Sequence, residues 1–249
     1  MPKDLKHKCS IVIPVYKDEM THNESLVIKN IMKMYNESML YIVCPEQLKL
    51  PKTIVHLKTE RFEDFYFEGI KGYNQLLLSK KFYKRFSTFD YILIHQLDAF
   101  LFKEQLEFWC DQNYDYIGAP WLRDDRFLAK LLRSEKVRNR NIVFNKVGNG
   151  GLSLRKVKTF NRFIAEQGEI INNYKHDELY GIEDVFWSII APQFQKIEIP
   201  NCKIAGKFSL DRKPEFGMKI NKSVLPFGCH GFEKNKTKKF WKKYIDGLE

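Results

Sequence analysis

Residues 91–100, which read Tyr-Ile-Leu-Ile-His-Gln-Leu-Asp-Ala-Phe, constrain the fold more than any other stretch of the chain. Four apolar residues run directly into a polar tip, which carries one carboxylate at Asp98. A short apolar run of this kind is typical of a buried strand, and open α/β sheets bind ligands beyond the carboxyl ends of their strands. We therefore expect Asp98 to lie at a binding site. The alternative is that Asp98 caps the N-terminus of a following helix.

The segments before this strand predict a parallel sheet. Residues 9–16 and 39–44 are strand-like, and residues 24–35 between them have apolar side chains at roughly helical spacing. A strand, a helix and a strand in succession form a βαβ unit, which places the two strands parallel. Further expected strands are residues 53–57, 115–119, 197–199 and 208–210. Further expected helices are residues 65–86, 104–111, 155–167 (with Gly168 as its C-terminal cap) and 183–190.

The 249 residues contain no evident repeat or linker, so we expect a single domain over residues 1–249. Residues 122–146 are charged and lack a clear period, which predicts a mobile basic loop or a partly helical insertion. Residues 234–249 form a Lys-rich C-terminal tail.

The net charge of +11 permits attraction to a polyanion, such as a phosphorylated glycan, an anionic membrane or nucleic acid. A solvated basic surface is the plainer alternative. No nucleic-acid module is recognisable, so no specific nucleic acid is expected. The five scattered cysteines include no Cys-x-x-Cys pair, which argues against a disulfide framework or a zinc site. No apolar run approaches the ~20 residues of a membrane span, and no signal peptide is evident, so we expect a cytoplasmic protein.

Three other short motifs can carry chemistry. The turn at residues 148–151 (Gly-Asn-Gly-Gly) lets backbone approach a ligand closely, although it matches neither the dinucleotide fingerprint nor the P-loop, and a plain tight turn is the alternative. Glu183 and Asp184 begin a helix, either as a general base and its neighbour or as acids that complement the helix dipole. His230 stands in a turn of small residues, as a metal ligand or as an ordinary histidine.

Taken together, these motifs resemble GT-A nucleotide-sugar glycosyltransferases. The chain looks still closer to a little-characterised glycosyltransferase-like family, a domain of unknown function. The resemblance rests on seven segments in order: residues 11–17, 72–86, 90–102, 109–121, 147–156, 183–187 and 226–232. It implies an α/β, Rossmann-like GT-A domain with a mostly parallel central sheet flanked by helices.

The resemblance also implies a donor site. Residues near the first strand would hold the nucleotide base, here Pro14, Val15, Tyr16 and Glu19. Asn74 matches a residue that contacts the nucleoside, and Gly150 and Gly151 match a turn that lines the sugars. The family's DxD motif, which binds a divalent cation and the donor diphosphate, corresponds to Gln96, Leu97 and Asp98. His230 matches the late histidine that completes the metal shell beside Asp98.

Mn²⁺ or Mg²⁺ is therefore the expected cofactor. Because Gln96 replaces the first acid of the motif, metal binding would be weak, or the site would be metal-independent, with a cation such as Lys17, Lys207 or Arg212 neutralising the diphosphate. Asp184 matches the base of inverting enzymes and Glu183 would contact acceptor hydroxyls, although the two roles could be exchanged.

The function implied is transfer of a sugar from a nucleotide-sugar donor, with a UDP-sugar favoured, to a hydroxyl of a glycan or a lipid-linked acceptor. This is a hexosyltransferase-like activity. The Lys-rich tail would suit peripheral contact with the inner face of a membrane. The alternative is a degenerate, non-catalytic GT-A scaffold that binds a polyanionic glycan or nucleic acid through its basic surface.

Overall fold

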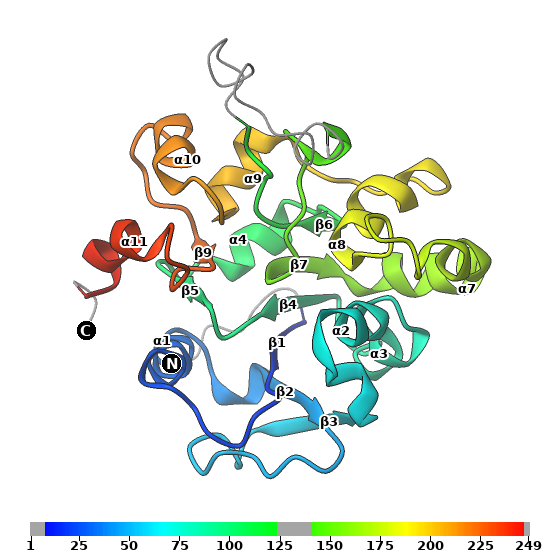
Figure 1. The fold of residues 1–249 in the computed structure, drawn as a ribbon, viewed down its shortest axis with the longest axis horizontal. Helices are drawn as coiled ribbons and strands as arrows, with labels where there is room; N and C mark the ends of the chain where they lie inside the picture. Colours follow the sequence, from blue (N-terminus) through cyan, green and yellow to red (C-terminus); the bar gives the residue numbers. More distant parts are fainter. Residues whose placement is uncertain (1–7, 124–140, 247–249) are drawn as a thin grey trace.

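The computed structural model describes residues 8–123 and 141–246 and is built around a six-stranded sheet (Figure 1). The strand order is β3-β2-β1-β4-β7-β6. The first four strands pair in parallel, whereas β7 runs antiparallel to both β4 and β6. The bounds are β1 (Cys9–Pro14), β2 (Leu40–Pro45), β3 (Lys58–Phe62), β4 (Tyr91–His95), β6 (Tyr116–Ile117) and β7 (Leu152–Lys156). The expected α/β fold with a mostly parallel central sheet is confirmed.

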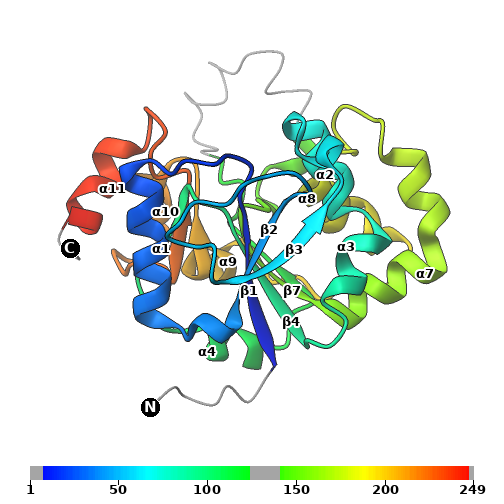
Figure 2. The ribbon, with the colours of Figure 1, turned by 90° about the horizontal axis from the view of Figure 1, so that it is seen from below.

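Helices cover both faces of this sheet (Figure 2). One side carries α2 (Gly69–Leu77), α3 (Lys80–Arg85), α7 (Val157–Tyr174) and α8 (Glu183–Val185). The other side carries α1 (His22–Met34), α9 (Cys202–Phe208), α10 (Pro214–Ile220) and α11 (Lys238–Ile245), with α4 (Leu106–Asp111) near the lower edge. Because both faces are covered, strands β1 and β4 are buried along their whole length, as their continuous apolar sequences predict.

A capping box at Thr21 and Glu24 starts α1, the helix of the first βαβ unit. Thr21 accepts a hydrogen bond from the backbone of Glu24, and the Glu24 side chain accepts one from the backbone of Thr21. This capping box satisfies two amide groups that would otherwise lack partners at the start of α1. The βαβ unit predicted from the sequence is therefore present as β1, α1 and β2.

A second, smaller sheet was not expected. It has the order β5-β9-β8, from β5 (Ala99–Leu101), β8 (Ser209–Leu210) and β9 (Gly228–His230). Strand β9 is antiparallel to β5 and parallel to β8. Because β5 follows β4 after a three-residue turn, this sheet brings the C-terminal part of the chain to the end of β4.

Several local predictions were wrong. Residues 53–57 form turns in which Ile54 and Leu57 bond back to carbonyls three residues earlier, and the strand begins only at Lys58. Residues 197–199 form no strand. The expected helix over residues 65–86 is broken into a 3₁₀ turn (Asp64–Phe67), α2 and α3. The helix predicted to end at residue 167 is interrupted there, because the backbone of Gln167 is non-helical (φ −128°, ψ 25°), and a second helical segment of α7 then continues through Gly168 to Tyr174.

The structure bears differently on the two basic segments predicted from the sequence, residues 122–146 and 234–249. Most of the basic segment 122–146 lies outside the described residues, so its expected character stays a prediction. The Lys-rich segment 234–249 contains a folded helix, α11, whose Trp241 is fully buried and stacks on Phe102 at 5.4 Å between ring centroids. No helix in the described part of the chain is both long enough and apolar enough to cross a membrane.

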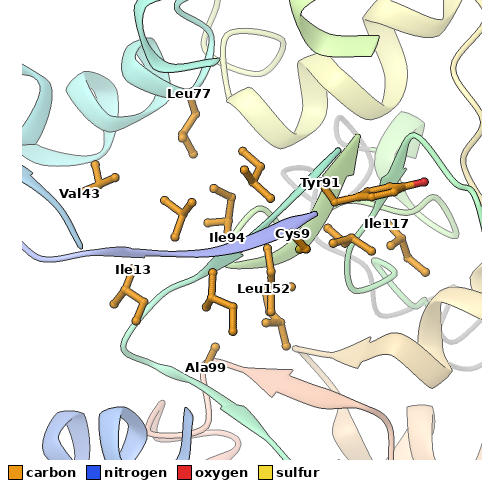
Figure 3. Packing of buried hydrophobic residues seen from close by; sticks show 14 of the residues in the cluster. Cys9, Ile13, Val43, Leu77, Tyr91, Ile94, Ala99, Ile117 and Leu152 are labelled. Atoms are coloured by element: carbon orange, nitrogen blue, oxygen red, sulfur yellow. The ribbon is translucent and has the colours of Figure 1, made fainter. Parts of the chain in front are cut away.

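The core packs against both faces of the central strands (Figure 3). Leu77 lies on one side of the sheet and Ala99 on the other. Beneath α7, the rings of Tyr83, Phe160 and Trp187 form an aromatic cluster with centroid separations of 4.9, 4.4 and 5.8 Å. The many Phe and Tyr residues of the sequence thus contribute substantially to the core.

Shortening Leu93 tests this core. Leu93 is fully buried at the centre of β4, between Ile11 of β1 and Leu154 of β7. Leu93→Ala leaves a cavity there and should lower the free energy of unfolding by about 2–5 kcal/mol, measured by urea denaturation. Val55→Ala, at an exposed position, is the matched control and should change it by less than about 0.5 kcal/mol. Equal effects would contradict the assigned burial.

Candidate active site

A cavity of about 560 Å³ opens at the carboxyl ends of the parallel strands β1 and β4. This is the edge at which open α/β sheets bind ligands. Strand β7 runs antiparallel to β4, with Leu152 opposite His95, so the turn that precedes β7 reaches the same edge. The sheet topology therefore explains why the Asp98 tip and the glycine turn meet.

Most of the predicted site residues line this cavity. They are Pro14, Tyr16, Asn74, Gln96, Leu97, Asp98, Gly150, Gly151, Glu183, Asp184 and His230. Val15 and Glu19 do not contribute to the lining, because Val15 is fully buried in the core and Glu19 is exposed outside the cavity. Glu24, which the sequence analysis did not select, does line it and pairs with Lys17 at 2.8 Å.

Asp98 lies in the turn between β4 and β5. No helix begins there, because the chain continues directly into β5 at Ala99, so the helix-cap interpretation is wrong. The backbone carbonyl of Asp98 accepts hydrogen bonds from the N–H groups of Gly231 and Phe232, at 2.8 and 3.2 Å. These bonds fix the turn against the end of β9 and bring the Asp98 carboxylate beside His230.

His230 lies between two carboxylates. Its Nε2 is 3.0 Å from Asp98 Oδ1, and its Nδ1 is 3.4 Å from Asp211 Oδ1. Burial acts to lower the pKa of His230, but hydrogen bonding to Asp211 and Asp98 outweighs burial and raises it to about 9. Burial likewise acts to raise the pKa of Asp98, and contact with His230 reverses this and holds it below its usual value.

The donor atoms around His230 fit a divalent cation. Gln96 Oε1 and Asp98 Oδ1 lie 3.1 and 3.0 Å from His230 Nε2. Neighbouring ligand atoms in an octahedral shell with bonds of about 2.1 Å are about 3.0 Å apart. Asp211 would hold the imidazole from its other nitrogen, as carboxylates commonly do for metal-bound histidines.

The third donor in this set is a neutral amide. Among the residues that the structure describes, no three His, Cys, Asp or Glu side chains are grouped so that they could hold a metal ion. A cation bound here would depend on two strong protein ligands, Asp98 and His230, together with Gln96 and groups from a substrate.

Side chains from other elements lie very close to the backbone of the glycine turn at residues 148–151. A Cβ atom on Gly151 would lie 2.2 Å from His230 Nε2 and 2.7 Å from Gln96 Oε1. A Cβ atom on Gly150 would lie 1.8 Å from Glu183 Oε1. The absence of side chains at these two positions therefore lets the cluster around His230 and the acidic pair lie on either side of one backbone turn.

Glu183 is held by a buried arginine. Its two carboxylate oxygens each lie 3.0 Å from Nη2 of Arg155, and both side chains are almost completely buried. Arg155 also donates to Ser153 Oγ at 3.1 Å and to the Tyr83 hydroxyl at 2.8 Å. Burial raises the pKa of Glu183 to about 7, against the opposing effect of Arg155. The Glu183 carboxylate thus contacts Arg155, and Glu183 also lines the cavity.

Asp184 is the less buried acid of the pair and also lines the cavity. Its Oδ2 accepts a hydrogen bond from the Gly150 N–H at 3.2 Å, while its Oδ1 has no partner. Burial raises the pKa of Asp184. A partly buried carboxylate with a raised pKa in a cleft is a candidate base.

Besides Glu24, sequence reasoning missed three charged residues. Asp211 directly follows β8, so its place beyond a predicted strand is the same kind of signal that identified Asp98. Lys234 Nζ lies 3.8 Å from Asp98 Oδ2 and 3.6 Å from Asp211 Oδ1, although the sequence placed it in a basic tail. Arg155 follows a strand pattern, and nothing in the sequence distinguishes it from a surface arginine.

The three cationic side chains proposed from the sequence to neutralise a diphosphate are less well placed beside Asp98 than Lys234 is. Lys17 is paired with Glu24, Lys207 lines a different cavity, and the Arg212 side chain is 79% exposed. Lys234 is the lysine that the structure places beside Asp98.

Comparison with known proteins identifies the family. Residues 56–230 match the model of a family described as a protein of unknown function, DUF5672. The chain belongs to this family. The match extends from just before β3 to His230, so it includes the predicted residues from Asn74 onward and leaves out Tyr16 and Lys234. A comparison with curated proteins finds no match for this sequence.

Solved structures identify the fold of this DUF5672 member. A structure of the galactosyltransferase LgtC in complex with donor and acceptor sugar analogs aligns with a TM-score of 0.57 and 12% identity, over 96% of this chain and 94% of that chain. Apo mouse xyloside xylosyltransferase 1 aligns with a TM-score of 0.53 and 8% identity, over 92% and 98% of the chains. The GT-A fold expected from the sequence is thereby confirmed.

Removing Arg155 tests the buried pair. Arg155→Met leaves the Glu183 carboxylate without its partner and should destabilise the fold by about 3–5 kcal/mol, measured by urea denaturation. The double variant Arg155→Met/Glu183→Gln removes that unpaired charge and should recover part of the loss. Loss of Arg155 should also raise the pKa of Glu183 further. The stability of the single variant should then fall as pH rises, because ionising this acid costs more in the folded state than in the unfolded state. A double variant no more stable than the single one would contradict this.

Proposed function

We propose that this DUF5672 protein is a glycosyltransferase that moves a sugar from a nucleotide-sugar donor to an acceptor hydroxyl, assisted by a divalent cation. The observation that carries the proposal is the convergence of Gln96, Asp98 and His230, with spacing that suits a cation, in a cavity of a GT-A fold. The alignment with a galactosyltransferase that was crystallised with donor and acceptor sugar analogs supports it.

The nucleoside would bind at the β1 end of the cavity. Tyr16 lines the cavity and is 63% exposed, so its ring is free to stack on a base. Asn74 Oδ1 accepts the Glu183 N–H at 3.3 Å, which leaves the Asn74 amide group for a ligand while it fixes the start of α8. A UDP-sugar is the favoured donor.

The diphosphate would lie between these residues and the cluster around His230. Gln96, Asp98 and His230 would hold Mn²⁺ or Mg²⁺, and a cation bound there supplies Lewis-acid stabilisation of the charge that develops on the diphosphate leaving group. Lys234, 3.8 Å from Asp98, adds a positive charge beside the same position. Gln96 in place of the first acid makes the protein ligand set less negative and weakens cation binding, so Lys234 would help to neutralise the diphosphate directly.

Asp184 would accept the proton of the acceptor hydroxyl. Asp184 lines the cavity with one oxygen unpartnered and its pKa raised, whereas Glu183 is tied to the buried guanidinium of Arg155 through a hydrogen bond to Oε1. Between the two roles that the sequence left exchangeable, the geometry favours Asp184 as the base. Glu183 would then be a positioning residue. The proposed acceptor is a glycan or a lipid-linked sugar, and the proposed transfer is that of a hexose.

Replacing Asp98 tests the donor site. Asp98→Asn should weaken binding of UDP at least about tenfold in the presence of Mn²⁺, because an anionic ligand of the cation is lost, and should change it little without metal. Calorimetry with UDP, GDP and CDP, with and without Mn²⁺, measures this. Glu178→Gln, at an exposed carboxylate outside the described cavities, is the control.

Two outcomes would count against the proposal. An equal loss of affinity without metal would make Asp98 a structural residue. Failure of the wild-type protein to bind any of the three nucleotides would remove the glycosyltransferase function and favour a non-catalytic scaffold.

Replacing Asp184 tests the chemistry. Asp184→Asn should reduce sugar transfer by about 10²–10⁴-fold, the usual contribution of a general base, and should leave donor binding intact. Product mass measured over a panel of nucleotide sugars and acceptors gives the rate, and calorimetry gives the donor affinity. Asp177→Asn, at an exposed turn outside the cavity, is the control. Unchanged turnover in Asp184→Asn would exclude it as the base.

A further inference from the structure

A second cavity, of about 660 Å³, lies among α4, α9 and the segment that follows α10. None of the residues that line it also lines the first cavity. Its size is within the range of about 300–1,000 Å³ that is typical of small-molecule sites. Neither the family match nor the proposed transfer reaction assigns a role to it.

The walls of this cavity are joined to one another. Asn221 at the end of α10 donates from its side chain to the Gly206 carbonyl of α9, at 2.6 Å. Trp109 of α4 packs edge-to-face on Phe208 of α9, with ring centroids 5.2 Å apart. Lys103 donates to the carbonyl of Leu225. These contacts connect three elements distant in sequence, so the cavity exists without a ligand.

The segment after α10 is fixed in an unusual conformation. Lys222 and Ser223 have positive φ values of 53° and 63°, which side-chain-bearing residues seldom adopt. The Ser223 N–H donates to the Met218 carbonyl at 2.8 Å, and the Lys222 N–H donates to Lys219 at 3.1 Å. This closed turn holds Lys222 and Val224 at the rim of the cavity.

The cavity is strongly basic. Four lysines contribute to its lining: Lys103, Lys203, Lys207 and Lys222. In the part of the chain that the structure describes, the lining contains no Asp or Glu. Lys203 and Lys207 are four residues apart on α9, so they project from one face of that helix. A recess with several positive charges and no negative charge concentrates anions.

Aromatic and apolar groups complete the lining. The Phe108 side chain is 52% exposed, and Tyr114 is half-buried. An exposed ring face beside ammonium groups suits a ligand that has both an apolar face and a negative charge. A sugar ring with a carboxylate or a phosphate is such a ligand, because one face of the ring presents C–H groups while its substituents carry the charge.

We propose that this second cavity binds an anionic saccharide, a sugar ring that carries a carboxylate or a phosphate. The recessed shape favours this ligand over a membrane surface, since lipid headgroups in a bilayer contact protruding groups more readily than a hollow. The proposal is independent of whether the first cavity transfers sugar, because binding at the second cavity is measured directly.

Calorimetry on the full chain tests the proposal with defined probes. The probes are a tetrasaccharide of galacturonic acid, a hexose 6-phosphate, inorganic phosphate and a neutral tetrasaccharide of galactose. We expect one or both anionic sugars to bind and the neutral one not to bind. The two anionic arms distinguish a carboxylate from a phosphate as the recognised group.

Two double variants separate a specific site from general attraction to a basic protein. Lys203→Gln/Lys207→Gln should weaken the anionic sugar about tenfold or more, through loss of charge-assisted hydrogen bonds. Lys236→Gln/Lys239→Gln removes the same charge from positions outside the cavity and should change the affinity less than about twofold, because these side chains do not line the cavity and their charge is screened by solvent. Equal losses in the two variants would overturn the proposal.

A third variant tests the aromatic contribution. Phe108→Ser should weaken the sugar that binds and leave the response to inorganic phosphate unchanged. An equal effect on both would overturn the proposed ring contact. Thermal unfolding checks that each variant folds.

The membrane alternative is tested with vesicles that contain phosphatidylserine. Binding to these vesicles that depends on Lys203, Lys207 and Phe108, without binding to either anionic sugar, would overturn the saccharide proposal, as would failure of both sugars to bind.

Discussion

The buried guanidinium of Arg155 is the group on which the geometry of the candidate site depends. An arginine remains charged in a protein, so a fully buried one must be surrounded by acceptors. The acceptors here are Ser153, Tyr83 and Glu183, which come from β7, α3 and α8. Because Glu183 is drawn inward to Arg155, Asp184 is left at the cavity wall, where the Gly150 amide orients it. The electrostatic requirement of one core residue thus sets the position of a carboxylate on the surface of the cavity.

The second constraint is the meeting of two sheets at Asp98. Strand β4 of the central sheet ends at His95, three residues before Asp98, and β5 of the small sheet begins directly after Asp98 at Ala99. His230 ends β9 and Asp211 follows β8, so three strands of the small sheet present their polar ends on one side. The candidate cation site therefore lies where the two sheets meet, and each sheet contributes donors to it.

The parts of the site that were predictable share a local signal. Gln96 and Asp98 follow an uninterrupted apolar strand, and Gly150 and Gly151 stand in a glycine-dense turn, so neighbouring residues indicate their roles. Arg155 and Lys234 have no such signal, because their roles depend on partners 28 and 136 residues away in the sequence. The break in the helix expected over residues 65–86 was hidden for a related reason, since tertiary contacts decide where each helical turn ends.

The pairing of β5 with β9 also bears on the order in which this protein can acquire its site. Ala99 and His230 are register partners, although 130 residues separate them in the chain. Contacts of such long sequence separation form late, because the intervening chain must first be ordered. The central sheet from β1 to β4 can assemble from the first hundred residues, whereas the donors around His230 come together only after β9 has emerged. A nascent or truncated chain would thus hold a compact central sheet before the side chains around His230 are brought together.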